Sequence, residues 1–131
     1  YLSEHGVPAT PADLLDHRCF NFSFVSPWNK WSFLQDGEGV SVPVTASASF
    51  TQGDLLRDMA LSGAGVVKLA DFHIGLDVKA GTLVPLLEEF KSGIIEPVYL
   101  LYSDRKHLSP RIRVFIEFFQ EKWRQNPWKV T

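Results

Sequence analysis

Residues 51–72, TQGDLLRDMALSGAGVVKLADF, contain the signals of a helix, a turn and a strand within one short stretch. Thr51 precedes Asp54 by three residues, so its hydroxyl can accept from a first-turn amide while the carboxylate sits at the positive end of the helix. A helix is therefore expected to begin near Gln52. One apolar stripe at three- and four-residue spacing predicts its buried face: Leu55, Leu56, Met59 and Ala60.

The helix is expected to stop at Gly63 and Gly65, which allow a left-handed turn or a close backbone approach. The residues that follow, Val66, Val67 and Leu69, are apolar and mostly β-branched, as in a short buried strand. A helix that leads directly into a buried strand predicts an α/β fold.

The segments before this unit contain further start and stop signals. Residues 10–13, TPAD, predict a short helix that ends by His17. In residues 19–24, CFNFSF, phenylalanines alternate with smaller residues, which predicts a strand with an aromatic, core-facing side that ends at Ser26.

A β-hairpin is expected next. Residues 31–35 and 40–46 flank the Asp-Gly pair at 36–37, a dipeptide typical of tight hairpin turns. Pro43 cannot donate to a strand ladder, so the second strand is expected at an edge or with a bulge. The segment ASASF, residues 46–50, leads the chain into the helix that begins near Gln52.

After Phe72 the pattern is less regular. A short helix or turn interrupted by Gly75 and Gly81 is expected, then a strand over residues 83–87. Residues 88–97 read as a connecting loop and residues 98–103, VYLLYS, as another strand.

Ser109 and Pro110 predict the start of the last helix. This helix carries the strongest amphipathic signal in the chain, and its apolar face must be buried against another surface. The stripe consists of Ile112, Phe115, Ile116, Phe119 and Trp123.

Size and composition favour a single compact domain, since the chain has 131 residues and is 45% hydrophobic. The single cysteine, Cys19, excludes an internal disulfide and a cysteine zinc cluster, and we interpret it as a small buried hydrophobe in a protein of the reducing cytoplasm. No apolar run approaches the roughly 20 residues needed to span a bilayer, so no membrane partner is expected.

The net charge of −2 hides an asymmetry along the chain. Residues 1–103 carry six Lys/Arg and twelve Asp/Glu, a balance of −6, whereas residues 104–131 carry seven and three, a balance of +4. A basic end can indicate nucleic acid binding, but here the charges alternate with apolar helix positions. The preferred interpretation is a solvated helix face.

No residue pattern indicates a catalytic, cofactor or metal site. The GAG sequence at residues 63–65 follows a helix and precedes a strand, the reverse of the order in a dinucleotide fingerprint. There is no Walker loop and no nucleophile elbow. The histidines lack metal-ligand spacing and are interpreted as solvated: His5, His17, His73 and His107.

Five segments form a familiar set when they are taken in order: YLSEHGVPATPADLLDHRCF, the WSF hairpin with VSVPV, LLRDMALSGAGVVKLADF, AGTLVPLL and YLLYSDRKHLSPRIRVFIEFF. In this order and spacing they resemble the effector-binding domain of LysR-type transcriptional regulators, whose architecture is similar to that of type 2 periplasmic binding proteins. Two departures from the family pattern, Lys68 and Ala70, bear on the cleft.

The resemblance implies a mixed sheet flanked by helices and a division of the chain. Residues 1–96 would form the second subdomain, and residues 97–131 the crossover strand and last helix of a truncated first subdomain. The winged helix-turn-helix, the linker helix and the first half of the first subdomain are not in this sequence. The last helix is therefore expected to fold back on its own chain or to pack on a second copy, which predicts a homo-oligomer.

The resemblance also implies a small-molecule effector, contacted from the second subdomain by Phe24, Ser26, Ser49, Phe50, Thr51, Gln52 and Gly53. The free amides of Gln52 and Gly53 and the hydroxyls of Ser49 and Thr51 suit an anion such as a carboxylate, and Phe50 offers apolar contact. Alternatively, Thr51 only caps the helix and Phe50 only packs. With half the cleft absent, weak or no effector binding by this chain alone is expected.

Three functions remain open from the sequence. The leading hypothesis is a ligand-sensing domain that controls DNA binding by a helix-turn-helix outside this chain, without enzymatic activity. The second is a lobe of a solute-binding protein in a transport system, which shares the architecture. The third is a small enzyme that uses the region of Trp28 and Trp31, although core packing is preferred for these side chains because large aromatics dominate burial.

Overall fold

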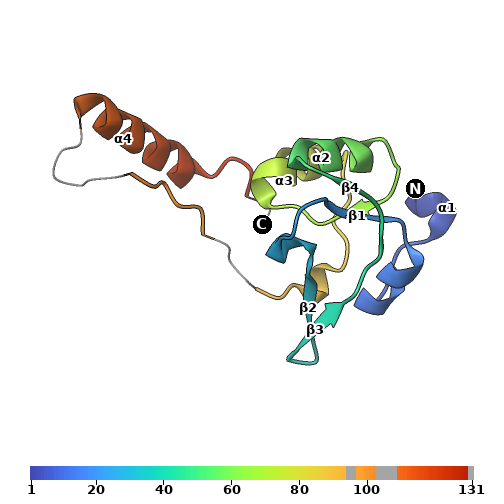
Figure 1. Cartoon of the computed structure of the whole chain (residues 1–131). Helices are drawn as coiled ribbons and strands as arrows, with labels where there is room; N and C mark the ends of the chain where they lie inside the picture. The colour runs from blue at the N-terminus through green and yellow to red at the C-terminus, as the bar shows by residue number, and fades with distance from the viewer. Residues whose placement is uncertain (94–96, 103–108, 130–131) are drawn as a thin grey trace. The chain divides into compact units, whose positions relative to one another are not determined.

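The computed structural model describes all residues except 94–96, 103–108 and 130–131 (Figure 1). The chain forms two compact units, one made of Tyr1–Ile94 with Trp128–Thr131 and the other of Ile95–Pro127. The predicted subdomain boundary at residues 96–97 stays a prediction. The elements are α1 (Leu2–His5), η1 (Pro11–Asp16), β1 (Cys19–Phe22), η2 (Pro27–Asn29), β2 (Trp31–Gln35), β3 (Glu38–Val42), β4 (Ala46–Phe50), α2 (Gly53–Leu61), β5 (Val66–Val67), α3 (Asp71–Ala80), η3 (Glu88–Phe90) and α4 (Pro110–Gln125), where η denotes a 3₁₀ helix.

A three-stranded parallel sheet in the order β4-β1-β5 organises the first unit (Figure 1). β4 pairs with β1 up to the last residue of both strands, where Phe50 lies opposite Phe22. β5 is shorter and pairs only with Cys19 and Phe20. Parallel strands joined through α2 confirm the predicted α/β class. The strand β4 itself was missed, because its alternating alanines and serines carry no apolar signal of their own.

Both faces of this sheet are buried, so the unit has two hydrophobic cores. On one face Cys19 packs with Leu14 and Trp31. On the other, Phe20 and Phe22 pack against Leu56 of α2. Cys19 is the buried hydrophobe that was expected, and burial raises the pKa of its thiol to about 11.

Helix α2 begins one residue later than the Thr51 cap requires. Its N-cap is Gln52, whose side chain makes no capping hydrogen bond, so the prediction that Thr51 caps the helix is wrong. Leu56 is fully buried and Met59 is half-buried, as the stripe predicted, but Leu55 lies at the margin of the stripe and is 44% exposed.

The predicted stop of α2 is confirmed. Gly63 has a φ of 73°, and its amide donates to the carbonyl of Ala60 while the amide of Ala64 donates to that of Met59. This pair of bonds is the Schellman arrangement, which satisfies the last carbonyls of a helix. Gly65 allows the backbone to pass close to Arg18, the residue before β1, because a Cβ at position 65 would overlap the carbonyl oxygen of Arg18.

The short helix predicted from residues 10–13 also forms, as the 3₁₀ helix η1. The carboxylate of Asp13 accepts from the amides of Ala9 (2.8 Å) and Thr10 (2.9 Å). These hydrogen bonds hold the pKa of the Asp13 carboxyl below its usual value.

The hairpin of β2 and β3 has the predicted turn, with positive φ at Asp36 (52°) and Gly37 (81°). This geometry matches the natural twist of paired strands. Pro43 lies directly after β3 in a two-stranded sheet, where it costs no ladder bond. Trp31 is 3% exposed and donates from Nε1 to Oδ1 of Asn21 (2.7 Å), which supports the core interpretation.

Helix α3 runs through Gly75 and stops at Gly81, so only the second glycine acts as a breaker. An ion pair with two hydrogen bonds fastens α3 to α2: Nε and Nη2 of Arg57 each lie 2.6 Å from a carboxylate oxygen of Asp77. The Arg57 guanidinium holds the pKa of the Asp77 carboxyl below its usual value.

Two predicted strands do not form. Residues 83–87 are irregular because Pro85 cannot donate to a ladder and Leu87 takes a left-handed conformation with φ of 56°, although Leu86 and Leu87 still pack on the core of Cys19. In the described part of residues 98–103 there is no strand, since a strand requires a neighbouring chain to pair with.

The second unit carries α4, whose predicted start is confirmed. The hydroxyl of Ser109 accepts from the amide of Ile112 (3.4 Å), and Asn126 ends the helix in a left-handed conformation. Four of the five stripe residues are exposed, among them Phe115 (51%) and Trp123 (39%), whereas Ile116 is half-buried. Both expected ways of covering the stripe, by the chain itself or by a second copy, stay predictions.

Candidate functional site

The carboxyl ends of β1 and β4 meet the amino end of α2. The register places Asn21 opposite Ser49 and Phe22 opposite Phe50, and the pairing continues past the strand, where the amide of Ser23 donates to the carbonyl of Phe50 (2.9 Å). Only two residues separate β4 from α2. In open α/β sheets, ligands bind at the carboxyl ends of the strands, so this edge is the candidate site. We call it the strand edge.

The seven residues predicted from the sequence all belong to this edge. Phe24 and Ser26 follow β1, Ser49 and Phe50 end β4, and residues 51–53 lead into α2. The pairing of β1 with β4 brings the ends of these two strands together, although they are far apart in the sequence.

The polar side chains of the strand edge are exposed, whereas Gly53 is buried. The exposed residues are Ser49, Thr51 and Gln52, and the N-cap residue Gln52 makes no side-chain hydrogen bond to the first amides of α2. Amides at a helix start have no intrahelical acceptor, and the helix dipole adds positive potential there. The arrangement can therefore accommodate an anionic group.

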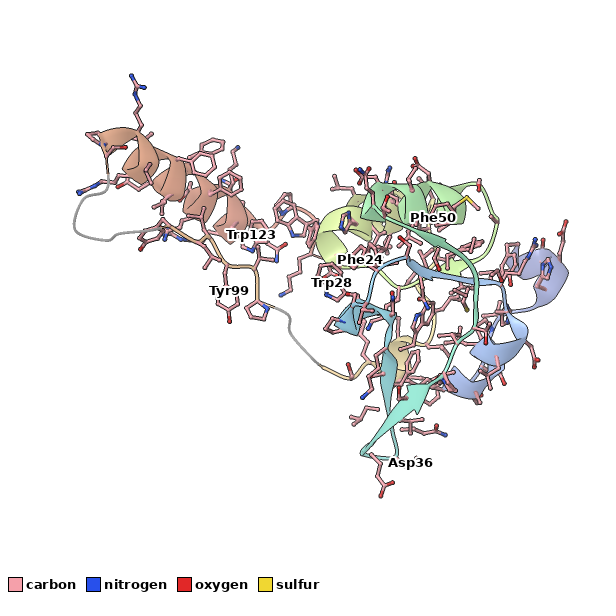
Figure 2. The ribbon with its side chains drawn as sticks, in the orientation of Figure 1. Phe24, Trp28, Asp36, Phe50, Tyr99 and Trp123 are labelled. Carbon is pink, nitrogen blue, oxygen red and sulfur yellow. The ribbon has the colours of Figure 1, made fainter. Side chains whose placement is uncertain are left out.

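The apolar part divides into two roles. Phe50 is half-buried and packs edge-on against Phe20, with ring centroids 6.1 Å apart, so its ring belongs to the core beneath α2. Phe24 is 44% exposed and packs on Phe22 (5.1 Å), which also contacts Trp28 (5.4 Å); Figure 2 labels Phe24 and Trp28. Of the two predicted aromatic contacts, Phe24 has the more accessible ring.

Asn29 organises the end of β1 and was missed in the sequence. Its Oδ1 accepts from the amide of Phe22 (2.9 Å), while its Nδ2 donates to the carbonyls of Phe22 (2.9 Å) and Phe24 (3.0 Å). β5 stops before this point, so the side-chain amide takes the place of a neighbouring strand. The sequence offered only a weak signal for this role, a polar residue two positions after the Ser-Pro pair at 26–27.

Ser26 has a local partner. Its hydroxyl accepts from the amide of Trp28 (3.2 Å) and so caps η2. The Trp28 ring leans on Phe22 with centroids 5.4 Å apart and is 44% exposed. The Ser26 hydroxyl thus fixes the turn at the strand edge.

His73 of α3 lies against the start of α2, so the interpretation of this histidine as solvated is wrong. A Cβ added to Gly53 would lie 2.6 Å from Cε1 of His73, and Nδ1 of His73 is 3.7 Å from a carboxylate oxygen of Asp54. Its side chain is 25% exposed. His73 lies in α3 whereas Gly53 and Asp54 lie in α2, so no local sequence pattern could have shown this contact.

The other histidines have different surroundings. Nδ1 of His17 lies 3.1 Å from the hydroxyl of Tyr1, and exposed His5 stacks on the Tyr1 ring at 4.3 Å. His107 lies outside the described residues. Within the described ranges, no group of three or more His, Cys, Asp or Glu side chains is placed to hold a metal ion.

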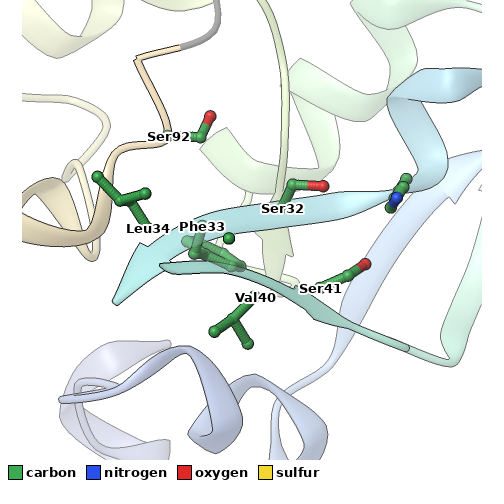
Figure 3. A pocket seen from close by; sticks show the side chains of 8 residues that line it. Ser32, Phe33, Leu34, Val40, Ser41 and Ser92 are labelled. Atoms are coloured by element: carbon green, nitrogen blue, oxygen red, sulfur yellow. The ribbon is translucent and has the colours of Figure 1, made fainter. Parts of the chain in front are cut away.

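A separate pocket of about 280 Å³ lies on the hairpin (Figure 3). None of the seven predicted site residues lines it, and none of its lining residues lies at the start of a helix. We therefore place the candidate site at the strand edge. The lining residues are Lys30, Ser32, Phe33, Leu34, Gly39, Val40, Ser41 and Ser92.

The comparison with protein families decides the assignment, since the model of the LysR substrate binding domain matches residues 1–124. The chain belongs to the LysR substrate-binding domain family. The predicted fold, of the type 2 periplasmic-binding-protein kind, is thereby confirmed.

Relatives and solved structures agree with this membership. The HTH-type transcriptional regulator CrgA of Neisseria meningitidis serogroup B is 34% identical over 126 residues, which cover 96% of this chain and 42% of CrgA. The HTH-type transcriptional activator AaeR of Escherichia coli is 30% identical over 119 residues, covering 88% of this chain and 37% of AaeR.

Among solved structures, the CrgA regulatory domain aligns with a TM-score of 0.85 at 34% identity, covering 93% of this chain and 59% of that chain. Full-length AphB of Vibrio cholerae, a virulence activator of the LysR type, aligns with a TM-score of 0.73 at 26% identity, covering 90% of this chain and 40% of that chain. This LysR-family chain spans about two fifths of the length of CrgA and AaeR.

In the part of the chain that the structure describes, no helix combines the length and apolar character needed to cross a bilayer.

Proposed function

We propose that this chain is the effector-sensing part of a LysR-type transcriptional regulator. A small anionic molecule binds at the strand edge, in a cleft completed by a further part of the regulator. Its binding controls how a helix-turn-helix domain outside this sequence engages DNA. The regulator acts on DNA in the cytoplasm as a homo-oligomer, and this chain contributes no catalysis.

The observation that carries the proposal is the register of β1 and β4. Because both strands end together beside the uncapped start of α2, the hydroxyls of Ser49 and Thr51 and the amides of Gln52 and Gly53 belong to one short edge. Hydroxyl and amide donors suit a carboxylate, and Phe24, which follows β1, offers an exposed apolar ring.

The alternatives gain less support. The relatives reported above are transcriptional regulators, which gives no support to a lobe of a transport system. An enzyme that uses Trp28 and Trp31 would need reactive groups beside them, but Trp31 is buried in the core and bonded to Asn21. These observations therefore favour neither the transport lobe nor the enzyme.

A thermal-shift screen of small carboxylates on the full-length regulator tests the function, followed by operator binding measured with each hit. We expect at least one carboxylate to raise the melting temperature and to change operator affinity. This chain alone should show a smaller shift, because it supplies only one side of the cleft. A hit that stabilises the protein without any change in operator affinity would contradict a sensing role.

A further inference from the structure

The middle of α3 contains a buried glycine that its backbone conformation does not require. Gly75 lies within the helix and is absent from the glycines of positive φ. Glycine is a poor residue for a helix interior, because it loses more conformational freedom than alanine and leaves the backbone uncovered. The absence of a side chain at position 75 therefore serves packing.

The group packed on Gly75 is the backbone of Trp128. A Cβ added at position 75 would overlap the carbonyl oxygen of Trp128 and would lie 2.7 Å from its carbonyl carbon. Trp128 is half-buried and belongs to the first unit, although α4, which precedes it, belongs to the second. The chain thus leaves the first unit near residue 95 and rejoins it at residue 128.

We propose that α3 around Gly75 is an intramolecular docking surface for residues 128–129, which we call the C-terminal strap. Asn126 ends α4 in a left-handed conformation, and Pro127 prevents the helix from continuing. These two residues redirect the chain, and the strap then fastens it to α3. The chain is consequently fastened to the first unit directly after α4.

The same helix contacts the strand edge through its first turn, where His73 lies against Gly53. Gly75, two residues further along α3, holds the strap. Residues two apart on a helix point in different directions, so α3 contacts the strand edge and the strap with different faces. Docking of the strap thereby ties the segment after α4 to the helix that borders the candidate site.

A double-mutant cycle tests the strap. Gly75→Ala is made in the full chain and in a chain that ends at Pro127, and unfolding in urea is measured with hydrogen exchange of residues 126–129. Gly39→Ala is the matched control, because a Cβ there meets nothing within 4 Å and its φ is not positive.

In the full chain, Gly75→Ala should destabilise the fold and speed exchange in the strap by about tenfold or more, as expected for a contact that opens locally. In the shortened chain, the same substitution should be neutral or stabilising, since alanine favours the helix. An equal effect in both chains would overturn the proposal. Failure of both variants to fold would also overturn it, because the clash would then lie within the rest of the first unit.

Discussion

Gly53 shows how one missing side chain shapes the candidate site. Its φ is not positive, so alanine fits the backbone, and alanine would favour the helix. We nevertheless expect Gly53→Ala to destabilise the protein by about 1–3 kcal/mol, because the new Cβ would lie 2.6 Å from the His73 ring. Urea unfolding measures the change.

The double variant Gly53→Ala, His73→Ala provides the control. Removing the ring should recover most of the stability lost in Gly53→Ala, since space for the new Cβ is then available. Additive losses in the double variant would show that the ring is not the obstacle.

Protonation of Asp77 should lower the stability of the folded protein at low pH. Hydrogen bonds from Arg57 lower the pKa of its carboxyl in the folded protein, so the ionised form stabilises the fold above the unfolded pKa of about 3.9. That stability is lost as the pH falls through the folded pKa. We expect stability to decrease below about pH 4, and Asp77→Asn to decrease less over the same range while being less stable at pH 7.

Thermal melts of the wild type and Asp77→Asn between pH 3 and pH 7 check this expectation. Asp13 has a lowered pKa as well and contributes a loss in the same direction, so a residual pH dependence is expected in Asp77→Asn. Parallel stability curves for the two proteins would show that the ion pair does not contribute.

At the scale of elements, the end of β1 depends on a side chain in place of a strand. Asn29→Ala would leave an amide and two carbonyls of Phe22 and Phe24 without their partner. We expect a loss of about 1–3 kcal/mol, the usual cost of an unsatisfied polar group in a partly buried position.

Asn29→Asp separates the two functions of the amide, because it keeps the acceptor for the Phe22 amide and loses the donors. Because a carboxylate oxygen would then face the carbonyl oxygens of Phe22 and Phe24, its stability in urea unfolding should be no higher than that of Asn29→Ala. Amide exchange near residues 22–24 should rise in both variants. Unchanged exchange there would mean that the sheet holds this segment without Asn29.

Elements with strong local signals were predicted correctly, whereas elements that depend on distant partners were not. The α2 stop at Gly63 and the hairpin turn at residues 36–37 are determined by neighbouring residues. β4 was missed because its strand character comes from pairing with β1. Residues 83–87 were wrongly predicted as a strand, since their apolar side chains are buried without ladder bonds.

The same distinction applies to the candidate site. The family resemblance supplied the seven predicted residues, and the strand register explains why they belong to one edge. Asn29 and His73 were not found, because their roles arise from contacts with other elements.

At the scale of the whole molecule, the exposed apolar face of α4 requires a cover. Large exposed apolar patches mark interaction sites, and Phe115 and Phe119 are 51% and 40% exposed. We expect this chain to self-associate in sedimentation equilibrium, and Phe115→Lys, Phe119→Lys to weaken association by at least about 30-fold, as loss of central aromatics does at interfaces.

The variant Gln120→Lys, Gln125→Lys adds the same charge to α4 outside its apolar stripe and should associate as the wild type does. A wild-type chain that sediments strictly as a monomer at all concentrations would remove self-association through α4.

The central claim is that the effector binds at the strand edge, and calorimetric titration of the full-length regulator with its carboxylate effector tests it most directly. Ser49→Ala, Thr51→Ala should weaken binding by about 100-fold, the loss of two hydrogen bonds to a charged group. Ser32→Ala, Ser41→Ala, which alters the hairpin pocket in the same way, should leave affinity unchanged. Unchanged affinity in the first variant, with weakened affinity in the second, would contradict the account.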